Sequence, residues 1–244
     1  MYAQAVKSVS VPTQSILFNI DIEGPLTKDK TAVLRVFAKM FYNHCGFYGD
    51  DLKIAKLERF IEKQGKTQQF REAFEKVNGA PWTETRDSFA FFEDDIVSVL
   101  QSTLGMSEQA ARNWFNGEET NELSIAQLVA DIQEYVDGKG KDFRLLFMVD
   151  EVGQYIGDDG DLMINLQSLV EEIGIRCHGK VWVMVTSQEA IDSVVHITGN
   201  DFSKIQGRFN TRLSLSSSSV DEVIKKRVLA KTDAADQLLR MVYD

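Results

Sequence analysis

The sequence predicts an α/β fold built on a parallel sheet that helices cover on both faces. Two continuous apolar runs of strand length, 143–149 and 181–185, flank an amphipathic helical stretch, and a third strand-like run at 15–22 precedes a long helical region. Continuous apolar strands that alternate with helices are typical of parallel sheets whose strands are buried on both sides. We therefore expect these runs to belong to one parallel sheet.

The N-terminal half contains one strand followed by helices. After a polar tail, the run SILFNIDI at 15–22 is rich in β-branched and aromatic residues, and Gly24-Pro25 ends it. From there to 142 the apolar residues recur with helical spacing, as Ile54, Leu57 and Ile61 do. Ser124 with Gln127 has the spacing of a capping box. We expect residues 1–24 to hold the tail and first strand, and 25–142 to form a helical insertion.

The C-terminal half returns to strands. The apolar run at 143–149, a helix around 162–173 and the strand 181–185 come first, followed by a short helix, a short strand at 211–215 and helices near 219 and 234. This pattern predicts a core at 143–215 and a helical segment at 216–244 that leads to a lid or a further domain.

Composition excludes several functional classes. The 244 residues carry a net charge of −10, which disfavours direct contact with a phosphate backbone, so any DNA contact is expected to be indirect. Cys45 and Cys177 lack CxxC spacing, which argues against a disulfide framework or a zinc knot. No apolar run approaches the roughly 20 residues that cross a bilayer, and no secretory signal is visible. We expect a cytoplasmic protein without membrane contact.

Polar residues stand at the ends of the two central strands. Asp150 and Glu151 follow LLFMV, a pattern with which P-loop ATPases hold magnesium and prepare the attacking water. The pattern assigns Asp150 to the magnesium, through a bound water, and Glu151 to the attacking water. Thr186 and Ser187 follow the next strand and suit a sensor that orients this water. Two alternatives remain open, because strands often end in solvated acids and Thr186 with Glu189 also has capping-box spacing.

Two arginines are candidates for a role in phosphoryl transfer, whereas a phosphate-binding loop is not found in the sequence. Arg208 and Arg212 are candidates for a finger that reaches a neighbouring subunit's nucleotide, although either is equally a surface arginine. A phosphate-binding loop needs GxxxxGK[ST] between a strand and a helix. Only 65–67, GKT, approaches it, but Phe60 stands in place of the first glycine, so we interpret GKT as a turn between helices.

Together these stretches resemble one family, the large P-loop ATPase of BREX phage-resistance systems (BrxC-type). The resemblance covers about 15–231 and is carried by DFRLLFMVDEVGQYIGDDGDLMINLQSLVEEIG, GKVWVMVTSQEAID and DFSKIQGRFNTRLSLSSSSVDEVIKKR. It implies an AAA+/ASCE-like fold, ATP and Mg²⁺ in the complete protein, Asp150 and Glu151 as the Walker B acids, Thr186 or Ser187 as the sensor and Arg208 or Arg212 as the finger. It also implies homo-oligomers and other BREX proteins as partners.

The resemblance implies that this chain is an internal fragment, or a gene product truncated before the Walker A motif. Strands in such ATPases are ordered 5-1-4-3-2, so 15–22, 143–149, 180–186 and 211–215 would be strands 2 to 5, with a large helical insertion between strands 2 and 3. Strand 1 and its Walker A loop would lie upstream, which leaves strand 4 with an unpaired edge and the fragment without hydrolysis of its own.

Two other functions remain open. Asp21 and Glu23, two apart on a predicted strand, share one face and suit a two-metal DEDD-type exonuclease, in which Tyr155 and Asp159 would complete a YxxxD motif. The other alternative is a module for interaction or oligomerisation that has no catalytic activity.

Overall fold

A computed structural model describes residues 10–25, 27–116 and 123–187, together with the single residues 209, 211, 213, 232 and 235. The chain divides into two compact units, Met1–Arg208 and Phe209–Asp244, and every element below belongs to the first unit. Within the described ranges, no helix combines the length and the apolar character that a bilayer span requires.

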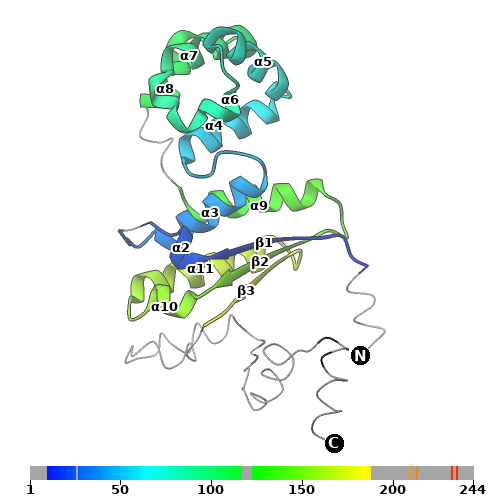
Figure 1. The fold of residues 1–244 in the computed structure, drawn as a ribbon. Coiled ribbons are helices and arrows are strands. Elements are labelled where there is room, and N and C mark those ends of the chain that lie inside the picture. The colour runs from blue at the N-terminus through cyan, green and yellow to red at the C-terminus, as the bar shows by residue number, and fades with distance from the viewer. Residues whose placement is uncertain are drawn as a thin grey trace, which may run out of the picture. The chain divides into compact units, whose positions relative to one another are not determined.

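Three parallel strands form the sheet, in the order β1 (Thr13–Asn19), β2 (Arg144–Asp150) and β3 (Val181–Val185). The predicted α/β fold with a parallel sheet is thereby confirmed (Figure 1). The predicted end of the first strand is wrong. The strand stops at Asn19, because the Asn19 side chain accepts hydrogen bonds from the backbone N–H groups of Asp21 (2.9 Å) and Ile22 (3.2 Å) and so caps a helical turn.

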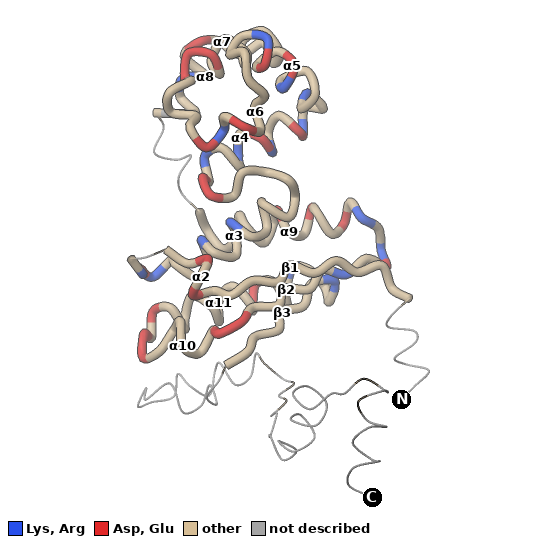
Figure 2. The backbone as a smooth tube through the Cα atoms, in the orientation of Figure 1, with Lys and Arg blue, Asp and Glu red and all other residues tan. Residues whose placement is uncertain are grey.

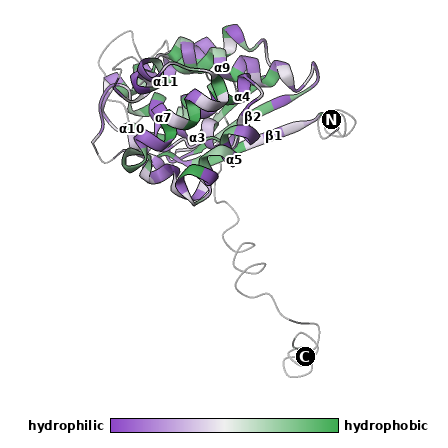
Figure 3. Ribbon diagram, turned by 90° about the horizontal axis from the view of Figure 1, so that it is seen from above, coloured by the Kyte–Doolittle hydropathy of each residue, from purple (hydrophilic) through white to green (hydrophobic). Residues whose placement is uncertain are grey.

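Helices occupy the two connections between strands. Between β1 and β2 lie α2 (Ile20–Glu23), α3 (Ala32–His44), α4 (Leu52–Lys63), α5 (Thr67–Asn78), α6 (Trp82–Thr85), the 3₁₀ helix η1 (Arg86–Phe91), α7 (Glu93–Leu104), α8 (Glu108–Asn116) and α9 (Ile125–Gly138). Between β2 and β3 lie α10 (Val152–Ile156) and α11 (Gly160–Arg176). Apolar and polar residues both occur along the labelled helices of Figure 3, and α3, α4 and α5 each bury apolar residues on one side.

One face of the sheet is buried beneath helices. Ile16 and Phe18 of β1 and Phe147 of β2 point to this face, where Phe37 of α3 lies 5.5 Å from the Phe18 ring and 5.3 Å from the Phe147 ring. Helix α11 packs against β3, α3 and α9 on this layer. Alternation of side chains along a strand then sends the intervening residues to the opposite face.

The opposite face is exposed in the described part of the chain, so the expectation of helices on both faces is wrong there. Leu17 is 69% exposed, Trp182 61% and Met184 48%. In the strand register, Leu17, Met148 and Met184 form one row across the sheet, beside Leu146 and Trp182. The order β1-β2-β3 advances in one direction. Right-handed crossovers therefore place both connections on the same face.

Helices α4 to α8 surround a hydrophobic core of their own, which includes Leu57, Phe70, Phe74 and Trp82 (Figure 1). One buried carboxylate, that of Glu58, is hydrogen-bonded to a residue of this core. Glu58 accepts hydrogen bonds from Trp82 Nε1 (2.7 Å), the Tyr48 backbone N–H (2.6 Å) and Arg86 Nη1 (3.0 Å). Two sequence predictions are confirmed nearby. Ser124 Oγ accepts a hydrogen bond from the Gln127 N–H (3.1 Å) at the start of α9, and Gly65, with φ of +65°, forms the turn between α4 and α5.

Candidate functional site

Polar side chains from all three strands meet at the carboxyl edge of the sheet. Asn19 and Asp150 are partners in the β1–β2 register, and Val149 is the partner of Val185, so that Thr186 emerges beside Asp150. This edge is where open parallel sheets bind ligands, because the loops that leave the strands there surround a common space.

Thr186 connects the ends of β2 and β3. Its hydroxyl donates a short hydrogen bond to Asp150 Oδ1 and accepts one from the Glu151 backbone N–H (3.2 Å). Its backbone N–H donates to the Val149 carbonyl (3.0 Å), and its carbonyl accepts from the Val152 N–H (3.0 Å). These contacts fix the Thr186 hydroxyl between the two acids, so the Asp150 carboxylate has a defined orientation.

Glu151 adopts a backbone conformation that few residues other than glycine accept. Its φ of +60° and ψ of 29° lie in the left-handed region, between the end of β2 and the first turn of α10. Asn19 Nδ2 donates a hydrogen bond to Glu151 Oε2 (3.0 Å), which brings the end of β1 into the site. A strained backbone at a strand end is typical of functional positions, since the surrounding contacts must maintain it.

Ser187 differs from Thr186 in its surroundings. Its hydroxyl oxygen is buried against Gly153 of α10, so closely that a Cβ at position 153 would lie 2.0 Å from it. Any side chain at 153 would therefore force the Ser187 side chain to move. Of the two residues predicted as sensors, Thr186 contacts the acids, whereas Ser187 packs beneath α10.

The carboxyl edge is rich in acids. Carboxylates come from Asp21 and Glu23 in α2, from Asp150 at the end of β2 and Glu151 after it, and from the α10–α11 turn (Figure 2). Lys28 lies among them, 3.8 Å from Asp21, and donates a hydrogen bond to the Tyr155 carbonyl (2.9 Å). No group of three or more His, Cys, Asp or Glu side chains within the described residues is arranged to hold a metal ion.

The remaining predicted residues divide between the described and the undescribed parts of the chain. Arg208, Arg212 and Glu189 lie outside the described residues, as does most of the strand predicted at 211–215. Asp21 and Glu23 lie in α2 and not on a strand, so they do not share a strand face as an exonuclease site would require. Of the predicted YxxxD pair, Tyr155 is buried and Asp159 caps α11.

Sequence reasoning missed Asn19. The signal was an asparagine close to the end of an apolar run, at the same edge as Asp150, but the run was extended three residues too far. No family model and no solved structure matches the chain.

Proposed function

We propose that this chain supplies the Walker B and sensor part of the nucleotide site of a P-loop ATPase of the BREX type, whose phosphate-binding loop lies upstream of residue 1. The observation that carries this proposal is the hydrogen bond from Thr186 to Asp150 beside the strained, Asn19-bound Glu151. An acid fixed by a neighbouring strand's hydroxyl, followed directly by a second oriented acid, suits phosphoryl transfer to water.

Each residue has a defined task in this proposal. Asp150 would hold the magnesium ion through one of its waters, and the Thr186 hydroxyl keeps the Asp150 carboxylate oriented. Glu151 takes the proton of the attacking water, with its carboxylate positioned by the Asn19 amide. Magnesium, when bound, neutralises charge on the phosphates. Arg208 or Arg212 would act from one subunit on the nucleotide of the next, which requires a homo-oligomer.

The residues at the edge fit a magnesium ion that takes most of its ligands from water and phosphate. A single oriented carboxylate beside a hydroxyl is the protein share of such sites, because Mg²⁺ keeps several waters and is not enclosed by protein oxygens. The same acids repel a bare polyphosphate. ATP binding therefore needs the cations and backbone N–H groups of a phosphate loop that the described residues do not contain.

The exposed part of the sheet also supports an upstream strand and helix. Among the described residues, β3 pairs only with β2, so its outer edge has room for another parallel strand. A right-handed crossover from that strand back to β1 would run over the exposed face and cover Leu17, Trp182 and Met184. The turn between that strand and its helix would lie beside Asp150 and Thr186, where the family resemblance expects a phosphate loop.

The experiment that tests the proposal begins with the coding sequence upstream of Met1. We expect an in-frame strand and glycine-rich phosphate loop there. Protein extended to include them should hydrolyse Mg-ATP, and Glu151→Gln should lower the rate by roughly 10²-fold or more without loss of ATP binding. A stop codon immediately upstream, or an extended protein that neither binds nor hydrolyses ATP, would reject the proposal. Ser168→Ala, in the middle of α11, serves as the matched control.

The second candidate function is an interaction or oligomerisation module without catalysis. The exposed apolar row on the sheet favours it, because contiguous apolar surface commonly marks an interaction site. This function predicts that Mg-ATP does not stabilise the 244-residue chain through the carboxyl edge, so any shift in melting temperature should be the same in the Asp150→Asn protein. It also predicts self-association in sedimentation experiments that Trp182→Ser weakens and the Trp114→Leu control does not.

A further inference from the structure

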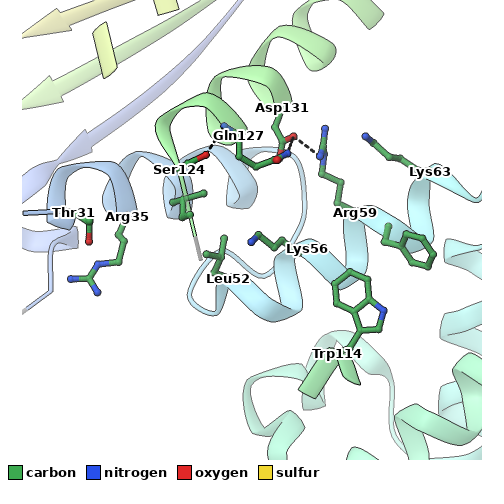
Figure 4. Close-up of a pocket in the computed structure, with 12 residues that line it drawn as sticks. Thr31, Arg35, Leu52, Lys56, Arg59, Lys63, Trp114, Ser124, Gln127 and Asp131 are labelled. Carbon is green, nitrogen blue, oxygen red and sulfur yellow. Dashed lines mark hydrogen bonds and ion pairs between the residues drawn. The ribbon is translucent and has the colours of Figure 1, made fainter. Parts of the chain in front are cut away.

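A cavity of about 800 Å³ is lined by residues of helices α3, α4, α8 and α9 and of the segments that precede α3 and α9 (Figure 4). None of Asn19, Asp150, Glu151 and Thr186 lines it. Its volume is within the range of about 300–1,000 Å³ that small-molecule sites occupy.

Helix α4 provides most of the basic wall. Its Ile54, Leu57 and Ile61 are buried in the core of the α4–α8 helices. Lys56, Arg59 and Lys63, which follow one another at intervals of three and four residues, occupy another side of the same helix. Figure 4 shows these three side chains extending from α4 toward the space below α9. Helix α4 therefore has one apolar side that packs in the core and one basic side that lines the cavity.

A buried network holds the central cation. Arg59 pairs with Asp131 of α9 (2.6 Å) and also contacts Glu134. Asp131 is only 4% exposed and accepts hydrogen bonds from Tyr42 Oη (2.7 Å) and Gln127 Nε2 (3.1 Å). Because Asp131 is fixed by three partners, the Arg59 guanidinium has a defined position in the wall. A guanidinium that is already held in position binds an anion with little further loss of conformational entropy.

Basic residues outnumber carboxylates among the described residues that line the cavity. Arg35, Lys56, Arg59 and Lys63 line the cavity, and Asp131 is its only carboxylate among the described lining residues. At the rim, Glu134 pairs with Lys63 (2.7 Å) and Asp29 with Arg35 (2.6 Å). The hydrogen bond from Lys63, together with Arg59, lowers the pKa of Glu134, so this carboxylate stays ionised. The exposed rim carboxylates can rotate into solvent when a stronger anion enters.

Aromatic rings form the wall beside the cations. The Trp114 indole of α8 and the Phe60 ring of α4 lie 5.6 Å apart between their centroids, and both line the cavity. An indole face next to ammonium and guanidinium groups accommodates a planar base and a phosphate in one ligand. Lys56 lies between Trp114 and the α9 wall in the close-up view (Figure 4).

We propose that this cavity binds a nucleotide, with the base against Trp114 and the phosphates at Lys56, Arg59 and Lys63. None of the polar residues at the carboxyl edge of the sheet lines this site, and binding there does not require Asp150 or magnesium. The Arg59–Asp131 ion pair holds the Arg59 guanidinium in position for the phosphates. A ligand here joins α4 and α8 of the helical core to α3 and α9, which pack on the sheet layer, so its binding stabilises that arrangement.

The test is calorimetric titration of the 244-residue chain with ADP in EDTA, which removes the contribution of any magnesium-dependent site. We expect saturable binding that Lys56→Glu weakens by at least about tenfold, because an opposite charge then faces the phosphates. Lys76→Glu is the matched control, since Lys76 is exposed on α5 and does not line the cavity. Trp114→Leu retains apolar bulk and should bring the affinity for ADP down to that for pyrophosphate.

Outcomes that overturn the proposal are defined by the same titrations. Absence of saturable ADP binding up to about 1 mM rejects it, as does an equal loss in the Lys56→Glu and Lys76→Glu proteins. Loss of EDTA-resistant binding in the Asp150→Asn protein would assign the ADP to the sheet edge and also reject it. Equal binding of ADP and pyrophosphate by the unmodified chain would exclude any role for the base.

Discussion

The strained backbone of Glu151 yields a prediction that compares two substitutions at one position. Glu151→Gly and Glu151→Ala both lose the 3.0 Å hydrogen bond from Asn19, whose net contribution is about 0.5–1.5 kcal/mol. Only glycine accepts the φ of +60° without strain, which costs other residues about 1–3 kcal/mol. Glycine also lowers the free energy of unfolding by roughly 0.5–1 kcal/mol relative to alanine, because the unfolded chain has more conformational freedom at a glycine.

From these contributions, we expect the Glu151→Gly protein to be more stable than the Glu151→Ala protein by roughly 1 kcal/mol. Relative to the unmodified chain, alanine should cost about 1 kcal/mol and glycine close to nothing. Equilibrium unfolding in urea, followed by far-UV circular dichroism, measures both differences. His178, with φ of +48° in the exposed turn before β3, is the matched control and should show the same preference for glycine. If alanine matches glycine at position 151, the backbone there is not strained and the reasoning fails.

Three further predictions concern buried groups. Glu58→Gln should lower the free energy of unfolding, measured in urea, by about 1–3 kcal/mol, because one amide oxygen cannot accept the three hydrogen bonds that the Glu58 carboxylate accepts. Glu62→Gln, on the exposed side of α4, is the control and should have little effect. Burial, and to a lesser extent Lys139, lowers the pKa of His44 below its usual 6.5, so the unfolded chain binds the proton more tightly; stability should fall as pH drops through about 6.5, and His44→Gln should remove that slope. Burial raises the pKa of Cys45 to about 12 and that of Cys177 to about 11, so both thiols should react with Ellman's reagent far more slowly than free cysteine until urea unfolds the chain.

The elements that were predicted correctly depend on local patterns. Continuous apolar residues at 145–149 and 181–185 identify strands without reference to the rest of the chain. Ser124 three residues before Gln127 and the glycine at 65 determine a helix start and a turn through contacts within four residues. The placement of Asp150 and Glu151 at the sheet edge follows directly from the end of the strand.

The features that were missed depend on contacts between distant residues. Asn19 binds Glu151 across 132 positions, and no local pattern distinguishes a strand that ends at Asn19 from one that continues to Ile22. The exposed face follows from the direction in which successive strands are added, which only the assembled sheet reveals. The basic cavity requires α4 and α9 to meet, and Arg59 and Asp131 are 72 positions apart in the sequence.

The exposed face of the sheet extends to the candidate site at its carboxyl edge. Side chains at 146, 148 and 150 alternate with the buried residues of β2, so Asp150 lies on the same face of the sheet as Met148 and Met184. Whatever covers this face therefore borders Asp150 and Thr186 directly. An apolar helix would bury Leu17, Trp182 and Met184, and the positive N-terminal end of such a helix would face the acids at the carboxyl edge. Stability of the sheet and the chemistry of its edge would then depend on one element, so a protein that acquires ATP hydrolysis by N-terminal extension should also lose exposure of Trp182. Acrylamide quenching, with Trp82 and Trp114 replaced by Phe, measures that exposure, and an active protein in which Trp182 remains fully quenched would separate the two properties.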